Sequence, residues 1–340
     1  LPGLDPTSTL TNICTTPTRS AIRTEALRRT FNEVTAVDGI DLDISTGEIY
    51  GFLGPNGAGK TTTLRMLCTL LTPTSGSASV AGFDVATQPG EVRLRIGVAL
   101  QEAALDPKQT GAELLRLQGL LYGLPKSAMP QRVRELGELM DLSDALDRRI
   151  ETYSGGMKRR LDLAAALVHN PDILFLDEPT TGLDPISRNT VWEEIDRLNR
   201  ELGMTILLTT QYLEEADLLA NRVGIIDRGK LVAEGTPAEL KRSVGADVIV
   251  ARVDGDASGA VAAVRAVEGV KDVEVHGNEL LVTTTAGSAT ISPVAVALSQ
   301  CEASVRDLTL RTPTLDDVFL ELTGSRIEIL STAGDEEASP

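Results

Sequence analysis

The stretch Gly54-Pro55-Asn56-Gly57-Ala58-Gly59-Lys60-Thr61 decides the fold of this chain. It matches the phosphate-binding pattern G-x-x-x-x-G-K-[ST] in full, between an apolar run at residues 48–53 and a helical run that begins at Thr62. The pattern requires a strand before the loop and a helix after it, and both flanks agree. The sequence therefore predicts a phosphate site rather than a glycine-rich turn without a ligand.

The residue types in this loop suit a nucleoside triphosphate. Glycines let backbone N–H groups turn toward the β-phosphate, and the following helix adds the positive end of its dipole. Lys60 places a point charge against the β and γ oxygens, and the Thr61 hydroxyl is positioned to ligate Mg²⁺. The candidate nucleotide-binding residues of this segment are Gly54, Asn56, Gly57, Ala58, Gly59, Lys60, Thr61 and Thr62.

Two carboxylates follow a second apolar run. Residues 173–176 end in Asp177-Glu178-Pro179, and the proline stops the strand. Ligands bind at the carboxyl ends of the strands in an open α/β sheet, so Asp177 is predicted to lie near the phosphate loop. We expect Asp177 to hold the metal and Glu178 to polarise the attacking water. The alternative, a solvated acidic turn, is disfavoured by the complete phosphate loop upstream.

Composition and charge limit the class of protein. The chain has 340 residues, more than one average domain of about 100–200 residues, so we expect two domains. Hydrophobic residues make up 42 % and aromatic residues 3 %, which predicts a mainly aliphatic core. A formal net charge of −17 disfavours a nucleic-acid partner, because phosphate backbones attract clustered Lys and Arg.

Cysteines and apolar runs indicate the compartment. Cys14, Cys68 and Cys301 are far apart and have neither metal-ligand spacing nor an obvious disulfide pairing, which favours a reducing, cytoplasmic setting. No stretch approaches the roughly 18–20 consecutive apolar residues that cross a bilayer, and no signal-peptide pattern opens the chain. We therefore expect that the chain does not span a membrane by itself.

Apolar runs that alternate with amphipathic helical stretches predict an α/β domain over residues 24–244, with a mainly parallel sheet. Within it, leucines at helical spacing predict an all-helical segment over residues 109–170. Residues 1–23 and 325–340 lack periodicity and are expected to form a flexible extension and a flexible acidic tail. The predicted strands are residues 48–53, 95–100, 172–176, 205–209 and 222–226.

A second, smaller unit is predicted over residues 245–324. Its pattern gives the order β-α-β-β-α-β, which is the ferredoxin-like arrangement of a small α+β domain. The pair Gly277-Asn278 between the two middle strands is a hairpin signal. Because the unit carries no phosphate motif and no paired carboxylates at a strand end, we interpret it as a regulatory or dimerisation domain.

The segment Tyr153-Ser154-Gly155-Gly156-Met157 lies between the phosphate loop and Asp177. In this order and spacing it resembles the signature motif of ABC ATPases, usually Leu-Ser-Gly-Gly-Gln. Ser154 and the N–H groups of Gly155 and Gly156 would form a second anion site at a helix N-terminus. Because the phosphate loop already surrounds the phosphates of its own nucleotide, this second site is expected to serve the γ-phosphate held by a partner subunit.

Further positions follow the same family. Gln101 resembles the Q-loop glutamine, which reaches the metal, and Gly182-Leu183-Asp184 resembles the D-loop. Phe31 resembles the aromatic residue that stacks on adenine, although an aromatic residue on an apolar face can instead belong to the core.

One position departs from the family pattern. The family usually has a switch histidine after the strand that follows the Asp-Glu pair, whereas this chain has Gln211 there. Its two histidines, His169 and His276, lie elsewhere in the sequence. Glutamine can hydrogen-bond a γ-phosphate and orient water, but it cannot carry a proton at neutral pH. We expect slow hydrolysis that persists because Glu178 remains.

The run at residues 211–217, the signature variant and the closing run at residues 315–324 together resemble one subgroup, the ATP-binding subunits of daunorubicin-resistance-type ABC exporters. The resemblance covers residues 24–324. It implies a P-loop NTPase fold, ATP and Mg²⁺ as ligands, and a homodimer of this chain carried by separate transmembrane permease subunits. It further implies a peripheral location at the cytoplasmic face of the cell membrane and export of drugs or hydrophobic lipids.

Two other functions compete with this one. A soluble ABC ATPase that works on ribosomes or DNA usually carries two cassettes or a long coiled-coil insertion, and this chain has neither pattern. A regulatory module that binds ATP without hydrolysing it is suggested by Gln211 and disfavoured by Glu178.

Overall fold

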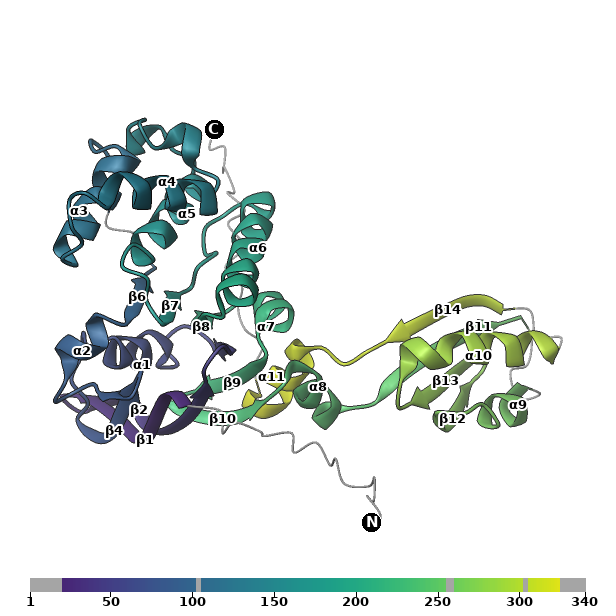
Figure 1. Ribbon diagram of the computed structural model, residues 1–340. Coiled ribbons are helices and arrows are strands. Elements are labelled where there is room, and N and C mark those ends of the chain that lie inside the picture. Colours follow the sequence, from purple (N-terminus) through teal and green to yellow (C-terminus); the bar gives the residue numbers. More distant parts are fainter. Residues whose placement is uncertain (1–19, 102–104, 255–259, 302–304, 325–340) are drawn as a thin grey trace, which may run out of the picture.

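The structure is a computed structural model that describes residues 20–101, 105–254, 260–301 and 305–324 (Figure 1). Residues 1–19, Cys14 among them, and residues 325–340 lie outside the described residues. The predicted extension over residues 1–23 is wrong for residues 20–23, because they belong to strand β1 (Ser20–Phe31). Ile22 pairs with Ile44 and with Val80 and is fully buried, so this strand is held by partners far along the chain.

A six-stranded sheet forms the centre of the first domain, in the order β10-β9-β3-β8-β7-β6. All neighbours are parallel except β10, which pairs antiparallel with β9. Every residue of β3, β7 and β8 is buried, which explains their continuous apolar runs. The five predicted strands are confirmed, with bounds β3 (Ile49–Leu53), β6 (Ile96–Ala99), β7 (Ile173–Asp177), β8 (Thr205–Thr210) and β9 (Arg222–Asp227); β10 is Lys230–Gly235.

A second, antiparallel sheet was not predicted. Its order is β2-β1-β4-β5, with β2 (Val34–Ser45), β4 (Ser75–Val80) and β5 (Phe83–Asp84). Strand β2 alternates between buried and exposed residues only in its second half, and β1 does not alternate regularly. Several register irregularities between the two strands go with this weak pattern. Helix α1 (Lys60–Leu67) contacts strands of both sheets, and its buried side chains share one core with theirs.

The predicted helical segment is confirmed. It consists of α3 (Gly111–Leu121), α4 (Met129–Leu139), the short 3-10 turns Ser143–Ala145 and Ile150–Thr152, and α5 (Gly155–Ala166). Figure 1 shows these helices grouped together beyond the ends of β6 and β7. A shared apolar cluster packs them against the central sheet and against α6 (Pro185–Leu202). The remaining helices of the first domain are α2 (Pro89–Arg93), α7 (Leu213–Leu219) and α8 (Pro237–Val244).

The second unit has the predicted ferredoxin-like order: β11 (Asp247–Val253), α9 (Val261–Arg265), β12 (Val270–His276), β13 (Glu279–Thr284), α10 (Gly287–Gln300) and β14 (Val305–Arg311). Its antiparallel sheet runs β12-β13-β11-β14. Gly277 adopts a φ of 66° in the hairpin between β12 and β13, as the Gly-Asn signal predicts. The unit has a core of its own, in which Leu280, Val282 and Leu298 are fully buried.

The last described helix corrects the predicted limit of this unit. Helix α11 (Leu315–Thr323) follows β14 but returns to the first domain, where it packs against α8 and α7 (Figure 1). Phe319 is 1 % exposed and lies in one cluster with Leu53, Leu213 and Leu240. The sequence could not show this, because an amphipathic helix does not indicate which surface covers its apolar face. Residues 315–323 therefore pack as part of the first domain.

Candidate functional site

The phosphate loop connects β3 to α1, and two of its positions, Gly54 and Gly59, leave no room for a side chain. Gly59 precedes the helix with a φ of 110°, and a Cβ atom there would lie 2.5 Å from the Ala36 carbonyl oxygen. At Gly54 a Cβ atom would lie 2.4 Å from the Ile226 carbonyl oxygen. Asn56 forms part of the exposed tip of the loop. The backbone of the loop is therefore closely seated between the two sheets, while its tip faces outward.

Lys60 is the first residue of α1 and is 4 % exposed. Its Nζ donates to the carbonyl oxygens of Gly54 (2.7 Å) and Pro55 (3.1 Å) and lies 3.4 Å from Glu178 Oε1. Burial lowers the pKa of Lys60, and the nearby Glu178 carboxylate opposes this shift. The ammonium group is thus held at the loop by contacts that phosphate oxygens can replace.

Asp177, the last residue of β7, is 1 % exposed and accepts two hydroxyl hydrogen bonds on Oδ1. The donors are Thr61 Oγ1 at 3.0 Å and Thr209 Oγ1 at 2.6 Å. Hard oxygen atoms of this kind suit Mg²⁺, which usually takes one or two protein oxygens together with phosphate oxygens and water. Within the described ranges, no group of three or more His, Cys, Asp or Glu side chains could hold a metal ion. Thr61 Oγ1 and Asp177 Oδ1 form a pair of oxygen donors that fits a metal shared with a nucleotide.

Glu178 follows directly and has a φ of 48°, in the left-handed region that non-glycine residues rarely adopt. Its N–H donates to the carbonyl and the hydroxyl oxygen of Thr209, both at 3.1 Å. Its Oε2 accepts from Thr181 Oγ1 at 3.2 Å and from Gln101 Nε2 at 3.4 Å. Strained backbone of this kind, which costs about 1–3 kcal/mol, concentrates at functional sites. Here it turns the carboxylate back toward Lys60.

Gln211 follows β8 and is 6 % exposed. Its Oε1 atom is buried and has no hydrogen-bond partner in the described part of the chain. A buried amide oxygen without a partner is costly, so this side chain is suited to a polar ligand or water. His169 stacks on Tyr122 and contacts the Ile96 carbonyl, at the opposite end of the sheet, and His276 is in the second unit. Neither histidine can replace Gln211.

Ser154 is the N-cap of α5, and its Oγ accepts from the Met157 N–H at 3.2 Å. Ser154 and Gly155 are exposed, and Gly156 is half-buried. The D-loop residue Asp184 caps α6 in the same manner, accepting from the N–H groups of Ile186 and Ser187. A hydrogen bond from Ser187 Oγ at 2.6 Å, together with these main-chain N–H groups, lowers the pKa of Asp184. The signature turn thus faces outward, open to a second molecule.

Phe31 ends β1 beside a tight turn and is 40 % exposed, with the Arg29 guanidinium 4.5 Å from its ring centroid. It is therefore not a core residue, and its exposure leaves part of the side chain accessible to a ligand. Thr209 is the site residue that sequence reasoning missed. The sequence feature that could have identified it is a pair of threonines at the end of a buried strand, directly before Gln211.

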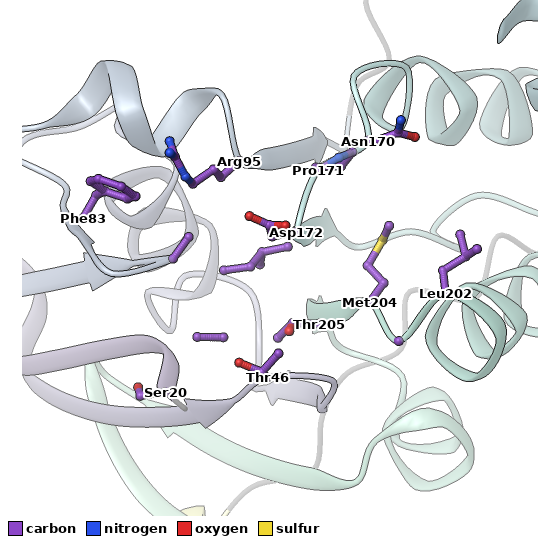
Figure 2. A pocket seen from close by; sticks show the side chains of 14 residues that line it. Ser20, Thr46, Phe83, Arg95, Asn170, Pro171, Asp172, Leu202, Met204 and Thr205 are labelled. Carbon is purple, nitrogen blue, oxygen red and sulfur yellow. The ribbon is translucent and has the colours of Figure 1, made fainter. Parts of the chain in front are cut away.

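A pocket of about 640 Å³ lies at the other edge of the central sheet (Figure 2). Asp172 and Thr205, which line it, stand at the amino ends of β7 and β8, whereas the phosphate loop follows the carboxyl end of β3. Arg95 also lines it and covers the Phe83 ring at 4.1 Å. This pocket is therefore separate from the candidate nucleotide site.

Comparison with known proteins agrees with this geometry. Residues 37–181 match the family described as ABC transporter, and residues 235–323 match the C-terminal domain of DrrA1-3-like ATP-binding proteins. The chain is 47 % identical over 331 residues to the daunorubicin/doxorubicin resistance ATP-binding protein DrrA of Streptomyces peucetius, covering 95 % of this chain and 98 % of that protein. This chain belongs to the daunorubicin-resistance type of ABC transporter ATP-binding proteins.

Two further relatives and one solved structure extend the comparison. This ABC ATPase is 41 % identical to the doxorubicin resistance protein DrrA of Mycobacterium tuberculosis, covering 92 % of this chain and 96 % of that protein. It is 37 % identical to the linearmycin resistance protein LnrL of Bacillus subtilis, covering 89 % and 98 %. Among solved structures, cbiO1 from Clostridium perfringens matches with a TM-score of 0.61 and 26 % identity, over 65 % of this chain and 90 % of that chain.

Membership of this family makes the chain a nucleotide-binding ATPase subunit, and ABC ATP-binding subunits dimerise and work with transmembrane partners. None of the helices within the described ranges has the length and apolar character of a membrane-spanning segment. The matching family is described as ABC transporter, which favours the transporter function over the ribosome- or DNA-associated ATPase.

Proposed function

We propose that this chain is the ATP-hydrolysing subunit of an exporter that moves drugs or other hydrophobic compounds, lipids included, through separate transmembrane permease subunits. Relatives of this chain are daunorubicin, doxorubicin and linearmycin resistance proteins, which supports this class of substrate. ATP hydrolysis is supported by the cluster of Lys60, Asp177 and Glu178 at the carboxyl edge of the central sheet.

In this proposal the phosphate loop holds the triphosphate of ATP. Backbone N–H groups from Gly54 to Thr62 and the start of α1 face the β-phosphate, and Lys60 exchanges its loop carbonyls for β and γ oxygens. The exposed ring of Phe31 stacks on adenine. A second copy of the chain supplies Ser154, Gly155 and Gly156 to the γ-phosphate, because these residues begin an outward-facing helix.

Thr61 and Asp177 are proposed to ligate Mg²⁺, with Gln101 completing the protein side of the site. When bound, the ion neutralises charge on the β- and γ-phosphate oxygens. Thr209 keeps the Asp177 carboxylate in place through its 2.6 Å hydrogen bond.

Glu178 and Gln211 are proposed to act on the attacking water. Glu178 accepts a hydrogen bond from this water and takes its proton as the oxygen attacks the γ-phosphorus. The bond from the γ-phosphorus to the bridging oxygen breaks, and ADP and inorganic phosphate leave. Gln211 donates a hydrogen bond to the γ-phosphate or to the water, without itself gaining or losing a proton.

The partners follow from the same proposal. Two copies of this chain close around two nucleotides, at the cytoplasmic face of the cell membrane, and transmit closure to the permease subunits. The ferredoxin-like unit, which lacks a phosphate motif, regulates or stabilises the dimer.

Phosphate release from Mg-ATP by the purified full chain tests hydrolysis, with Lys60→Ala as the inactive control. Transport is tested in vesicles that contain the chain and its permease subunits, by ATP-dependent movement of a fluorescent anthracycline. Hydrolysis without any transport would restrict the conclusion to an ATPase and overturn the proposed substrate class. Release of phosphate by Lys60→Ala at the parental rate would overturn the site itself.

A further inference from the structure

Arg159 lies on α5, the helix that begins at the signature turn, and is 7 % exposed. Its guanidinium group donates to three main-chain carbonyl oxygens on other elements: Nη1 to Leu100 at 2.7 Å, Nε to Pro179 at 2.8 Å and Nη2 to Asp177 at 3.4 Å. Nη1 also donates to Asp162 Oδ2 at 3.1 Å. A planar fork of this kind fixes the relative positions of the atoms it bonds.

The three carbonyls belong to two segments of the hydrolysis site. Leu100 directly precedes Gln101, and Asp177 and Pro179 stand on either side of Glu178. One side chain therefore joins the segment of the Q-loop glutamine to the segment of the proposed general base. Ser154 is the N-cap of the same helix, so α5 joins the signature turn to the residue that holds both segments.

A second buried group, on α7, holds the same segment. Glu215 on α7 is fully buried, and its Oε1 accepts from Thr180 Oγ1 at 2.9 Å and from Trp192 Nε1 at 2.8 Å. Thr180 follows Pro179, and Trp192 lies on α6, the helix that Asp184 caps. The segment around Glu178 is thus attached by side chains to α5, α6 and α7.

We propose that Arg159 is a positioning residue that couples the signature turn of one subunit to the hydrolysis site of that same subunit. The proposal rests on the function proposed above. When Ser154 and its neighbours bind the γ-phosphate of the partner's nucleotide, α5 moves as a unit, and Arg159 carries the movement to the main chain of Gln101 and Glu178. ATP at one site thereby prepares the other site, and hydrolysis depends cooperatively on ATP concentration.

The chain offers a matched control in the next residue. Arg160 also lies on α5 and also donates to two main-chain carbonyls and a carboxylate, but its partners are Met140 and Asp141 in the helical segment. We would prepare Arg159→Met, Arg159→Lys and Arg160→Met in the full chain. For each, we would measure phosphate release against ATP concentration, affinity for a fluorescent ATP analogue, and the melting temperature.

Arg159→Met is expected to lower kcat about 10–100-fold, because a small displacement of catalytic groups has effects of this size. Its Hill coefficient should fall to one, while nucleotide affinity stays within about twofold of the parent, since no Arg159 donor contacts the phosphate loop. Arg159→Lys keeps a charge beside Asp162, so its melting temperature should be close to that of the parent. Its Hill coefficient should nevertheless be one, as in Arg159→Met. Arg160→Met should keep the Hill coefficient of the parent.

Several results would overturn the coupling. One is a parental Hill coefficient in Arg159→Met, and another is equal loss of cooperativity in Arg160→Met. Recovery of the Hill coefficient together with the melting temperature in Arg159→Lys would reduce Arg159 to a buried charge partner of Asp162. If Arg159→Met does not fold, the Hill coefficient and melting temperature of Arg159→Lys, compared with those of the parent, test the coupling by themselves. A parent that hydrolyses ATP with a Hill coefficient of one overturns the coupling only, whereas a parent that neither binds nor hydrolyses ATP overturns the proposed function.

Discussion

Glu178→Gln tests the buried ion pair of the site. The substitution removes the carboxylate that lies 3.4 Å from the Lys60 ammonium, in a pair whose side chains are 4 % and 6 % exposed. Glutamine keeps the shape of the side chain and its hydrogen-bonding capacity but not its charge. The nucleotide-free protein should therefore lose stability, because a buried ammonium group is left without its nearest counter-charge.

The magnitude follows from what remains around Lys60. Removing one partner of a buried ion pair costs about 3–5 kcal/mol when the other charge is abandoned. Here two carbonyl oxygens still accept from Nζ, so we expect a smaller loss of about 2–3 kcal/mol. In a domain of about 150–250 residues this lowers the melting temperature by about 4–12 °C. Bound nucleotide should reverse most of the loss, because phosphate oxygens supply the missing charge.

Thermal unfolding with and without a non-hydrolysable ATP analogue measures this effect, and phosphate release measures turnover. Turnover should fall about 10²–10⁴-fold, the usual contribution of a general base. Glu193→Gln is the control, since it makes the same change of charge at an exposed position of α6. Equal nucleotide-free melting temperatures in the two variants would refute the argument about Lys60, and parental turnover in Glu178→Gln would remove Glu178 from the chemistry.

Three other outcomes are expected. Lys60→Ala should abolish binding of a fluorescent ATP analogue, and undiminished affinity would contradict the phosphate-loop assignment. Gln211→Ala should slow single-cycle hydrolysis with ATP affinity retained, while Gln211→His should add a step to the pH profile between about pH 6 and 7 that the parent lacks; a parental rate in Gln211→Ala would show that the position has lost its role. Phe319→Ala should lower the free energy of unfolding by about 3–5 kcal/mol in urea titration, because it empties a core position 1 % exposed. A loss below about 1 kcal/mol would mean that α11 is not docked.

The chemistry of the site was predictable because the residues of each motif are contiguous in the sequence. A phosphate loop needs its glycines, Lys60 and Thr61 at adjacent positions, so the local chain itself sets their geometry. The same holds for Asp177 and Glu178, since the end of a buried strand must emerge at the ligand-binding edge of a parallel sheet. The ferredoxin-like order was predictable for a related reason, because its strands and helices are close in sequence and their hairpin carries Gly277.

Only the tertiary structure decided contacts between distant parts of the chain. Strand β1 pairs with β4 across a long sequence separation, and its half-exposed residues carry no strong pattern. Thr209 meets Asp177 only because β7 and β8 are neighbours, and Arg159 reaches Leu100 only because α5 folds back over the sheet. The apolar face of α11 could have packed on either domain, and complementarity with the surface of the first domain selected its place. Such choices depend on the packing of whole surfaces, which no local pattern of residues encodes.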